Sequence, residues 1–191
     1  MESYILNVAT QIIIQAIAAY GLNVIVGNAG QISLGHAAFV GIGAYSAAML
    51  TTAAGFSFWQ SLPVSVLIVA AVGLLCGLPS LRVKEDFLAI TTIGINFIVV
   101  AIFQYTPALG GALGIGGIPR ARFFGTALKA PGYFALCLAF LVVTMAACRF
   151  FTRSWSGLSC FAVRDDETAA SSMGVSPVRA KLTAFVLGTA L

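Results

Sequence analysis

Long apolar stretches dominate the chain, and glycine, proline or charged residues separate one stretch from the next. The stretches lie near residues 4–26, 32–54, 62–80, 87–106 and 133–152, and a sixth starts near Leu182. A helix needs roughly 20 predominantly apolar residues to cross a bilayer, so each of the five has about the length of one span. The pattern predicts an all-α fold, a polytopic transmembrane helical bundle of about five spans plus the start of a sixth.

The sixth stretch is too short to cross the membrane. Only residues 182–191 remain after Lys181, and they cannot cover ~30 Å of hydrocarbon as a helix. We therefore interpret residues 1–191 as a single transmembrane domain that is incomplete at its C-terminus. The N-terminus lacks a basic segment and a small-residue cleavage site, so the first stretch is expected to be a retained span.

Composition strengthens the membrane interpretation. Apolar residues make up 60% of the chain and charged residues 8%, and no Asp, Glu, Lys or Arg occurs from Ser3 to Leu81. Globular chains are about 25% charged, so a soluble domain is excluded. The net charge of +4 does not form a basic stripe with interleaved aromatic residues, so nucleic-acid binding is not expected. The cysteines contain no C-x-x-C pair, so neither a metal site nor a disulfide framework is expected.

The distribution of Lys and Arg predicts an orientation. If 87–106 and 133–152 both cross, seven basic residues share one side, and three lie on the other. The first group is Arg82, Lys84, Arg149, Arg153, Arg164, Arg179 and Lys181, and the second is Arg120, Arg122 and Lys129. Because cytoplasmic loops carry the excess of Lys and Arg, the segment 153–180 is predicted to be cytoplasmic.

Polar side chains occur inside the first apolar stretch. Asn7, Gln11 and Gln15 are four residues apart, which places them on one helix face. This face either lines a polar pathway or forms hydrogen bonds between helices.

A glycine-rich stretch follows and continues the polar content. Its candidate residues are Asn23, Gly30, Gln31, Ser33, Gly35 and His36. They indicate either a translocation pathway or close helix packing. The glycines also leave open whether 32–54 crosses fully. No acidic residue or second histidine lies near His36 in sequence, so a metal or proton-relay role is not favoured.

The segment 153–180 contains helix start and stop signals. Asp165, Asp166 and Glu167 precede residues 168–173, and Gly174 and Pro177 follow them. Acidic residues stabilise a helix N-terminus, and glycine followed by proline ends a helix. A short cytoplasmic helix of this kind would present a surface to a soluble partner; an interfacial loop without a partner is the alternative.

The sequence lacks recognisable catalytic machinery. It contains no G-x-x-x-x-G-K-[ST] motif, no Ser/His/Asp or Cys/His arrangement and no pair of intramembrane carboxylates. We therefore expect no catalytic residue and no cofactor, and any ATP hydrolysis must occur on another chain.

Four blocks of residues resemble the permease subunits of bacterial branched-chain amino acid ABC importers. They are Gly21-Leu22-Asn23 with Gly27, Gly30, Ser33, Gly35-His36-Ala37, Phe39 and Gly43-Ala44-Tyr45; Leu81-Arg82-Val83-Lys84 with Asp86-Phe87-Leu88-Ala89-Ile90 and Thr92; Gly110-Gly111, Gly114-Ile115 and Gly117-Ile118-Pro119; and Arg153-Ser154, Gly157, Ala162-Val163-Arg164-Asp165-Asp166-Glu167, Ala169-Ala170, Gly174 and Lys181-Leu182. Together the blocks span almost the whole chain.

The resemblance implies a multi-pass subunit of the bacterial inner membrane that imports branched-chain or other small amino acids. Its implied partners are ATP-binding subunits, a second permease subunit, a periplasmic or extracellular amino-acid-binding protein and membrane lipid. It also implies that a helix at 165–174 couples transport to the ATPase, with Arg164, Asp165, Asp166, Glu167, Ala169, Ala170 and Gly174 as the coupling residues.

Two departures and two alternatives qualify the substrate assignment. Glu85 replaces a usual glycine, and Phe97 replaces a common acidic residue. The urea or short-amide branch of the same family shares these blocks. A non-transport membrane scaffold or a degenerate fragment is an alternative of another class.

Overall fold

A computed structural model of the chain describes residues 2–80, 85–123 and 126–191. Its helices are α1 (Glu2–Asn23), the π-helix η1 (Val24–Asn28), α2 (His36–Thr52), α3 (Phe58–Ser80), α4 (Glu85–Tyr105), the 3-10 turns η2 (Pro107–Leu109) and η3 (Gly111–Leu113), α5 (Ala130–Arg153), α6 (Trp155–Asp165), α7 (Glu167–Ser172) and α8 (Pro177–Ala190). Two short antiparallel strands, β1 (Arg122–Phe123) and β2 (Thr126–Ala127), are the exception to the predicted all-α class, which is otherwise confirmed.

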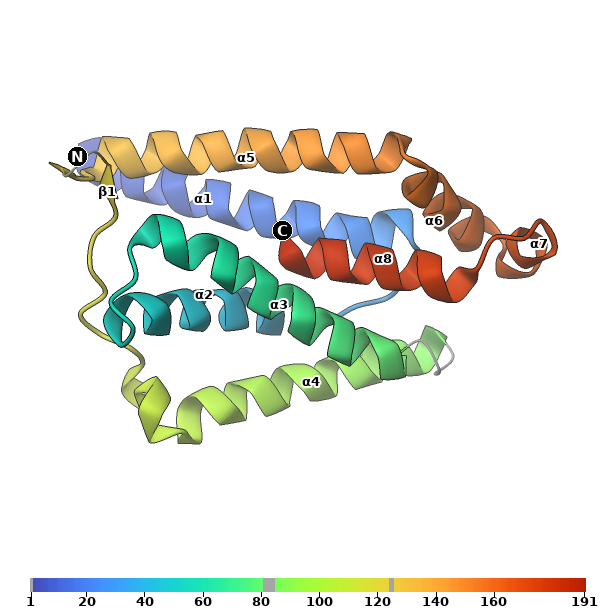
Figure 1. The fold of residues 1–191 in the computed structure, drawn as a ribbon, viewed down its shortest axis with the longest axis horizontal. Helices are drawn as coiled ribbons and strands as arrows, with labels where there is room; N and C mark the ends of the chain where they lie inside the picture. The colour runs from blue at the N-terminus through green and yellow to red at the C-terminus, as the bar shows by residue number, and fades with distance from the viewer. Residues whose placement is uncertain (1, 81–84, 124–125) are drawn as a thin grey trace.

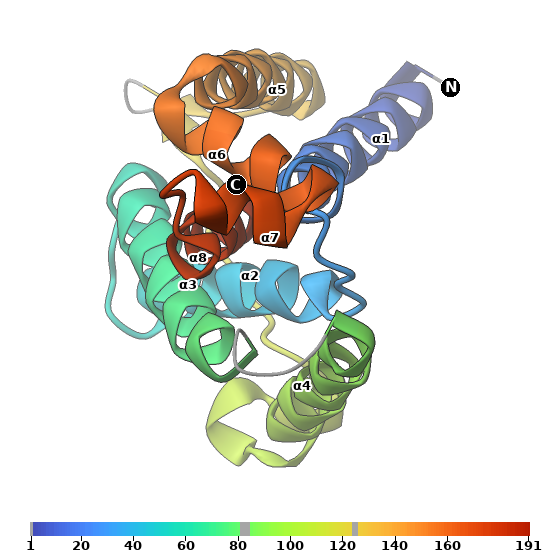
Figure 2. The same ribbon diagram turned by 90° about the vertical axis from the view of Figure 1, so that its right-hand side faces the viewer.

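The long helices form an elongated bundle (Figure 1). α1 packs along α5, α2 packs against α3, and α4 lies along the opposite edge of the bundle from α5. Seen from the end that carries α6 and α7, α8 occupies the centre and contacts α1, α3 and α6 (Figure 2). The N-terminus and β1 lie at the other end of the bundle.

Three helices in the described part of the chain are long and apolar enough to cross a membrane. They are Tyr4–Asn28, Phe58–Gly77 and Ala130–Arg153. A fourth candidate joins Ala89–Tyr105 to Pro107–Leu113 across a bend of 87°. The polytopic helical architecture is thus confirmed, with three or four qualifying spans where about five were predicted. The difference includes α2, whose 17 residues cover only about 26 Å at 1.5 Å per residue.

The helices start a few residues away from the predicted positions, and for two of them the shift has a local cause. α2 starts at His36 and not at residue 32, because Gly30 adopts a left-handed φ of +69° and residues 29–35 are not helical. α8 starts at Pro177 and not near Leu182, because proline is well suited to the first helical turn. The predicted basic residues Arg82 and Lys84 lie outside the described residues.

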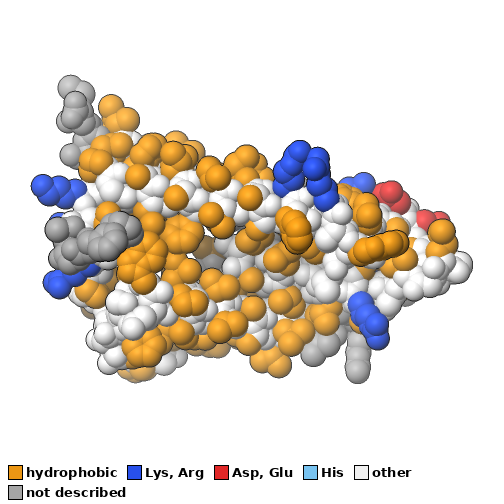
Figure 3. Space-filling view, turned by 45° about the horizontal axis from the view of Figure 1, so that its top comes forward, with side chains coloured by type: hydrophobic (Ala, Val, Ile, Leu, Met, Phe, Trp, Pro, Cys, Tyr) orange, Lys and Arg blue, Asp and Glu red, His pale blue; other side chains and the backbone are white. Residues whose placement is uncertain are grey.

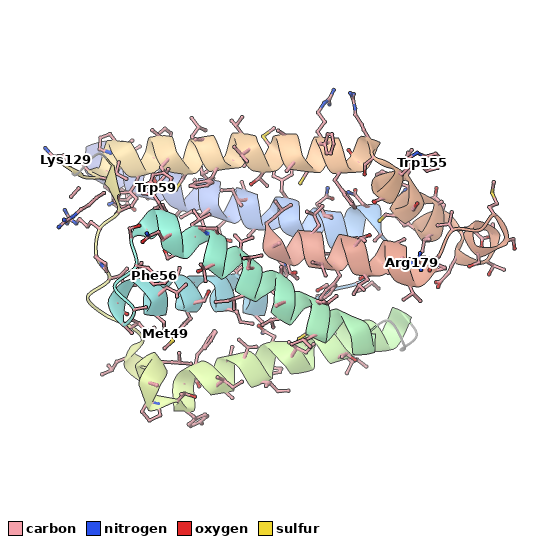
Figure 4. All side chains as sticks on the ribbon, viewed as in Figure 1. Met49, Phe56, Trp59, Lys129, Trp155 and Arg179 are labelled. Atoms are coloured by element: carbon pink, nitrogen blue, oxygen red, sulfur yellow. The ribbon has the colours of Figure 1, made fainter. Side chains whose placement is uncertain are left out.

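On the face shown in Figure 3, apolar side chains cover much of the surface, and the charged side chains lie at the left end and in the right-hand part. Large apolar side chains are exposed on the lengths of the outer helices, including Ile5, Ile12, Val142 and Val143. Lys129 lies at the β1 end, whereas Trp155 and Arg179 lie at the α6 end (Figure 4). An apolar belt between two polar ends is the surface expected of a protein surrounded by lipid.

The central helix α8 approaches its neighbours through small residues. A Cβ at Gly188 would lie 2.5 Å from Ile25 Cγ1 and 2.6 Å from the Gly21 carbonyl oxygen, so α1 and α8 cross nearly backbone to backbone. On the other side, a Cβ at Gly77 would lie 3.2 Å from the ring of Phe185. Gly77 therefore allows α3 to pack closely against α8.

We predict that Gly188→Ala destabilises the protein because the new methyl group overlaps Ile25 and the Gly21 backbone. Overpacking of this kind typically costs about 1–3 kcal/mol. Thermal unfolding in mild detergent should show a lower midpoint. The matched control is Gly94→Ala in α4, where an added Cβ meets nothing within 4 Å; an equal midpoint for the two variants would contradict the packing analysis.

Candidate functional site

The first span ends in a break that lies inside the bundle. The helix widens to π geometry over Val24–Asn28, and Gly30 then ends it in a left-handed conformation. The Gly30 and Gln31 amides donate to the carbonyls of Val26 and Ile25, at 3.1 and 3.2 Å. The chain then runs without helical structure to His36, and we call residues 29–35 the connecting segment. Non-helical backbone at membrane depth is tolerated only where protein covers it or where it lines a cavity.

Two other helices hold the connecting segment at its ends. At its start, Arg164 of α6 donates from Nη1 to the Gly27 carbonyl at 2.6 Å. A Cβ at Gly30 would lie 2.7 Å from Arg164 Cγ. At its end, the Leu34 amide donates to Thr92 Oγ1 of α4 at 3.0 Å, and Gly35 lies against the Thr92 backbone. The predicted coupling residue Arg164 and the predicted pathway residue Gly30 are therefore in direct contact.

Three predicted pathway residues bury their polar side chains here. Gln31, Ser33 and His36 are only 2%, 5% and 9% exposed. Among the described residues, Gln31 Nε2, Ser33 Oγ and His36 Nδ1 have no hydrogen-bond partner, although His36 also bonds to the backbone of Ala18. An unsatisfied buried polar group costs about 1–3 kcal/mol, so such groups are retained where they have another use.

Two cavities meet at His36. One, of about 470 Å³, lies between α1 and α2 and is lined by Gln15, Ser33 and His36 among apolar neighbours. The other, of about 290 Å³, reaches α3 and α8 and is lined mainly by apolar side chains, with Ser61 and Ser65 at its α3 wall. Apolar walls with a few polar groups are typical of small-molecule sites.

The remaining polar residues of α1 point elsewhere. Asn23 is exposed and lines neither of these cavities, so the structure does not bring it together with Ser33 and His36. Asn7 and Gln11 are also exposed. Gln15, which the sequence placed on the same face, is the member of that series that reaches a cavity.

The predicted helix in the 165–174 region is present as α7. Asp166 is its N-cap, and its Oδ1 accepts hydrogen bonds from the amides of Thr168 and Ala169 at 2.8 and 2.9 Å. Gly174 ends the helix with a φ of +84°. Ala170 is buried against the rest of the molecule, whereas Ala169 faces outward.

A charged pair and a groove join α7 to its neighbours. Glu167 pairs with Lys181 of α8 at 2.6 Å. A groove of about 420 Å³ runs between α6 and the start of α8 and is lined in part by Trp155, Met173 and Arg179. Met173 is 85% exposed at the tip of this end of the molecule, so an apolar side chain is presented outward between polar residues.

Sequence reasoning missed α6, which carries Arg164. Ser154 caps it, accepting from the Gly157 amide at 3.3 Å, and its buried face holds Gly157, Cys160 and Val163. Their spacing of three residues is a helical signal that could have revealed the element. Cys160 Sγ donates to the Ala180 carbonyl at 3.3 Å, and burial raises the pKa of this thiol.

The described residues contain no group of three or more His, Cys, Asp or Glu side chains that could hold a metal ion. The features that gather instead are a broken span with buried polar groups and a pair of short helices bound to that break. They define a multi-pass helical membrane protein. At one of its two polar ends, the short helix α6 contacts the break that follows the first span.

Comparison with known sequences identifies the family. The chain belongs to the permease components of branched-chain amino acid transport systems, whose family profile matches residues 4–191. The resemblance drawn from the four sequence blocks is thereby confirmed, as is a multi-pass membrane location.

Two curated relatives carry the same printed name, high-affinity branched-chain amino acid transport system permease protein LivM. The protein from Salmonella typhimurium strain LT2 is 34% identical and that from Escherichia coli K12 is 35% identical, each over 209 aligned positions. The alignments cover 96% of this chain and 49% of each relative, so the chain spans about half their length. No solved structure matches the chain significantly.

We predict that Asp166→Ala frays α7, because the Thr168 and Ala169 amides lose their side-chain acceptor. Loss of an N-cap costs about 0.5–2 kcal/mol, which corresponds to roughly 2- to 30-fold faster hydrogen–deuterium exchange over residues 167–172. Asp166→Asn keeps an acceptor and serves as the matched control. Equal exchange in the two variants would contradict the capping role.

Proposed function

We propose that this chain provides membrane-spanning permease structure for an ATP-driven importer of branched-chain or other small amino acids in the bacterial inner membrane. ATP hydrolysis occurs on separate ATP-binding subunits. A second permease subunit completes the pathway, and an external amino-acid-binding protein delivers the solute. The family match over residues 4–191 is the observation that carries this proposal.

The contacts at the α6 end support an ATPase-docking role. α7 is capped by Asp166 and tied to α8 through Glu167 and Lys181, so its outward face is held in a defined shape. Met173 and Ala169 lie on exposed positions of this end. An exposed apolar anchor ringed by polar groups is typical of a protein–protein contact. In this proposal the segment 153–180 is cytoplasmic and α7 is the coupling helix.

The connecting segment and its cavities form one wall of the solute pathway. Ser33 and His36 offer polar atoms without described partners, and the surrounding walls are apolar. This combination suits a solute with a polar backbone and an aliphatic side chain, which favours an amino acid over urea. Asn23 is the weakest member of the predicted pathway set because of its exposed position.

The docking role is tested by Met173→Glu in the complete transporter. A buried charge at the contact should abolish co-purification of the ATP-binding subunit and solute uptake. Leu113→Glu is the matched control for ATPase co-purification, because Leu113 lies in η3, outside α6–α8, and is 99% exposed. If the Met173→Glu protein still captures the ATPase as strongly as wild type, the contact lies elsewhere. A wild-type chain that purifies without any ATPase would favour a membrane scaffold.

The pathway role is tested by Ser33→Ala. Because Ser33 Oγ has no described partner, the change should leave stability nearly unaltered, while loss of one hydrogen bond to solute should reduce uptake about 5-fold. Ser57→Ala, at an exposed position just before α3 and outside both cavities, is the control. Radiolabelled leucine uptake, with urea as competitor, provides the measurement, and unchanged leucine kinetics would remove Ser33 from the pathway.

A further inference from the structure

We propose that Arg164 is an internal latch that couples the α6–α7 end of the protein to the connecting segment, and is not itself a docking residue for the ATPase. This inference rests on the proposed function, because it assigns the route by which movement of α6 and α7 reaches the pathway wall. It is carried by the contacts of Arg164 with Gly27 and Gly30, which lie 137 and 134 residues earlier in the chain (164 − 27 and 164 − 30).

The first contact is a hydrogen bond to the broken helix end. Nη1 of Arg164 donates to the Gly27 carbonyl at 2.6 Å. Gly27 belongs to the π-helix, whose last carbonyls lack ordinary helical partners. A charged donor forms a strong hydrogen bond to such a carbonyl, and a cation at a helix C-terminus is also favoured by the helix dipole.

The guanidinium is held in this orientation from its other side. Nε and Nη2 both donate to Asp165 Oδ1, at 3.3 and 3.2 Å. The Arg164 Cζ atom lies 5.4 Å from the centre of the Phe161 ring, which supplies a cation–π contact from the same helix. Arg164 is therefore fixed to α6 before it reaches Gly27, so a movement of α6 carries the guanidinium with it.

The second contact is steric. Gly30 presses against the Arg164 stem so closely that a Cβ there would lie 2.7 Å from Arg164 Cγ. Its φ of +69° further disfavours any side chain. α6 thus contacts the start of the connecting segment in two ways: through the hydrogen bond to Gly27 and through close packing against Gly30.

The far end of the connecting segment is also fixed. Leu34 donates to Thr92 of α4, and Gly35 packs on the Thr92 backbone. Between the two anchors lie Gln31 and Ser33, whose buried polar atoms line the interior. Because both ends of the connecting segment are held, a displacement of α6 must change the positions of the Gln31 and Ser33 side chains. Elements that switch between two states act in this way.

The test uses the complete transporter in proteoliposomes and measures ATP hydrolysis, leucine uptake and ATPase co-purification. We expect Arg164→Ala to retain ATPase co-purification and hydrolysis but to lower uptake at least 5-fold, so that more ATP is hydrolysed per leucine. Arg164→Lys keeps the charge but not the forked geometry, and should restore uptake only in part. Arg149→Ala removes an exposed arginine of α5 at the same end and should match wild type.

Gly30→Ala addresses the same latch from the other side. It should reproduce the uncoupling of Arg164→Ala, and the double variant should be no worse than either single variant, because both changes disable the same latch. Additive losses would overturn the latch. Loss of ATPase binding in Arg164→Ala would overturn it in favour of direct docking, and unaltered uptake per ATP would overturn it outright.

Hydrogen–deuterium exchange of the detergent-solubilised protein separates the latch from the proposed function. Arg164→Ala should raise exchange at the Gly30 and Gln31 amides at least 5-fold, whether or not leucine is transported. Unchanged exchange there overturns the latch even if wild type transports normally. If the wild-type protein shows no uptake but Arg164→Ala still raises exchange at the Gly30 and Gln31 amides, the importer assignment is refuted. The contact between Arg164 and the connecting segment is then still supported.

Discussion

The structure depends on how the backbone that leaves helical geometry at the end of the first span satisfies its polar groups. Burial of a backbone polar group without a hydrogen bond is costly, so the buried amides and carbonyls between η1 and α2 need protein partners. The Gly30 and Gln31 amides donate to carbonyls of η1, and Arg164 donates to the Gly27 carbonyl. Thr92 Oγ1 accepts a hydrogen bond from the Leu34 amide. These partners come from three different elements. The break is consequently the point at which α1, α4 and α6 are joined.

Several glycines lie where two elements approach closely. Gly30 and Gly35 sit where a neighbouring element approaches the connecting segment, and Gly188 and Gly21 sit where α8 crosses α1. In each case the absence of a Cβ allows backbone or stem atoms to touch. The close contacts also bury the side chains of Gln31 and Ser33, and they leave the two cavities beside His36 open.

Local signals in the sequence predicted much of this architecture. The apolar stretches located α1, α3 and α5, and Asp166 with Gly174 located α7, because spans and caps depend on nearby residues. The hydrogen bond from Arg164 to the Gly27 carbonyl was not predictable from the sequence. It joins residues 137 positions apart, and no spacing rule connects them. The sequence left open whether 32–54 crosses fully, and it placed the start of α2 too early for a related reason. The apolar pattern continues through residues 32–35, whose backbone is held by a hydrogen bond to α4.

The six residues of α7 are too few to hold a helix alone in water. The cap, the pair with Lys181 and the burial of Ala170 impose its shape from outside. A partner that docks on this surface therefore meets a helix whose conformational entropy has already been removed during folding. Association can then be fast to form and fast to reverse without great loss of affinity. In the proposed importer, this suits a contact that is made and released in every cycle of nucleotide hydrolysis.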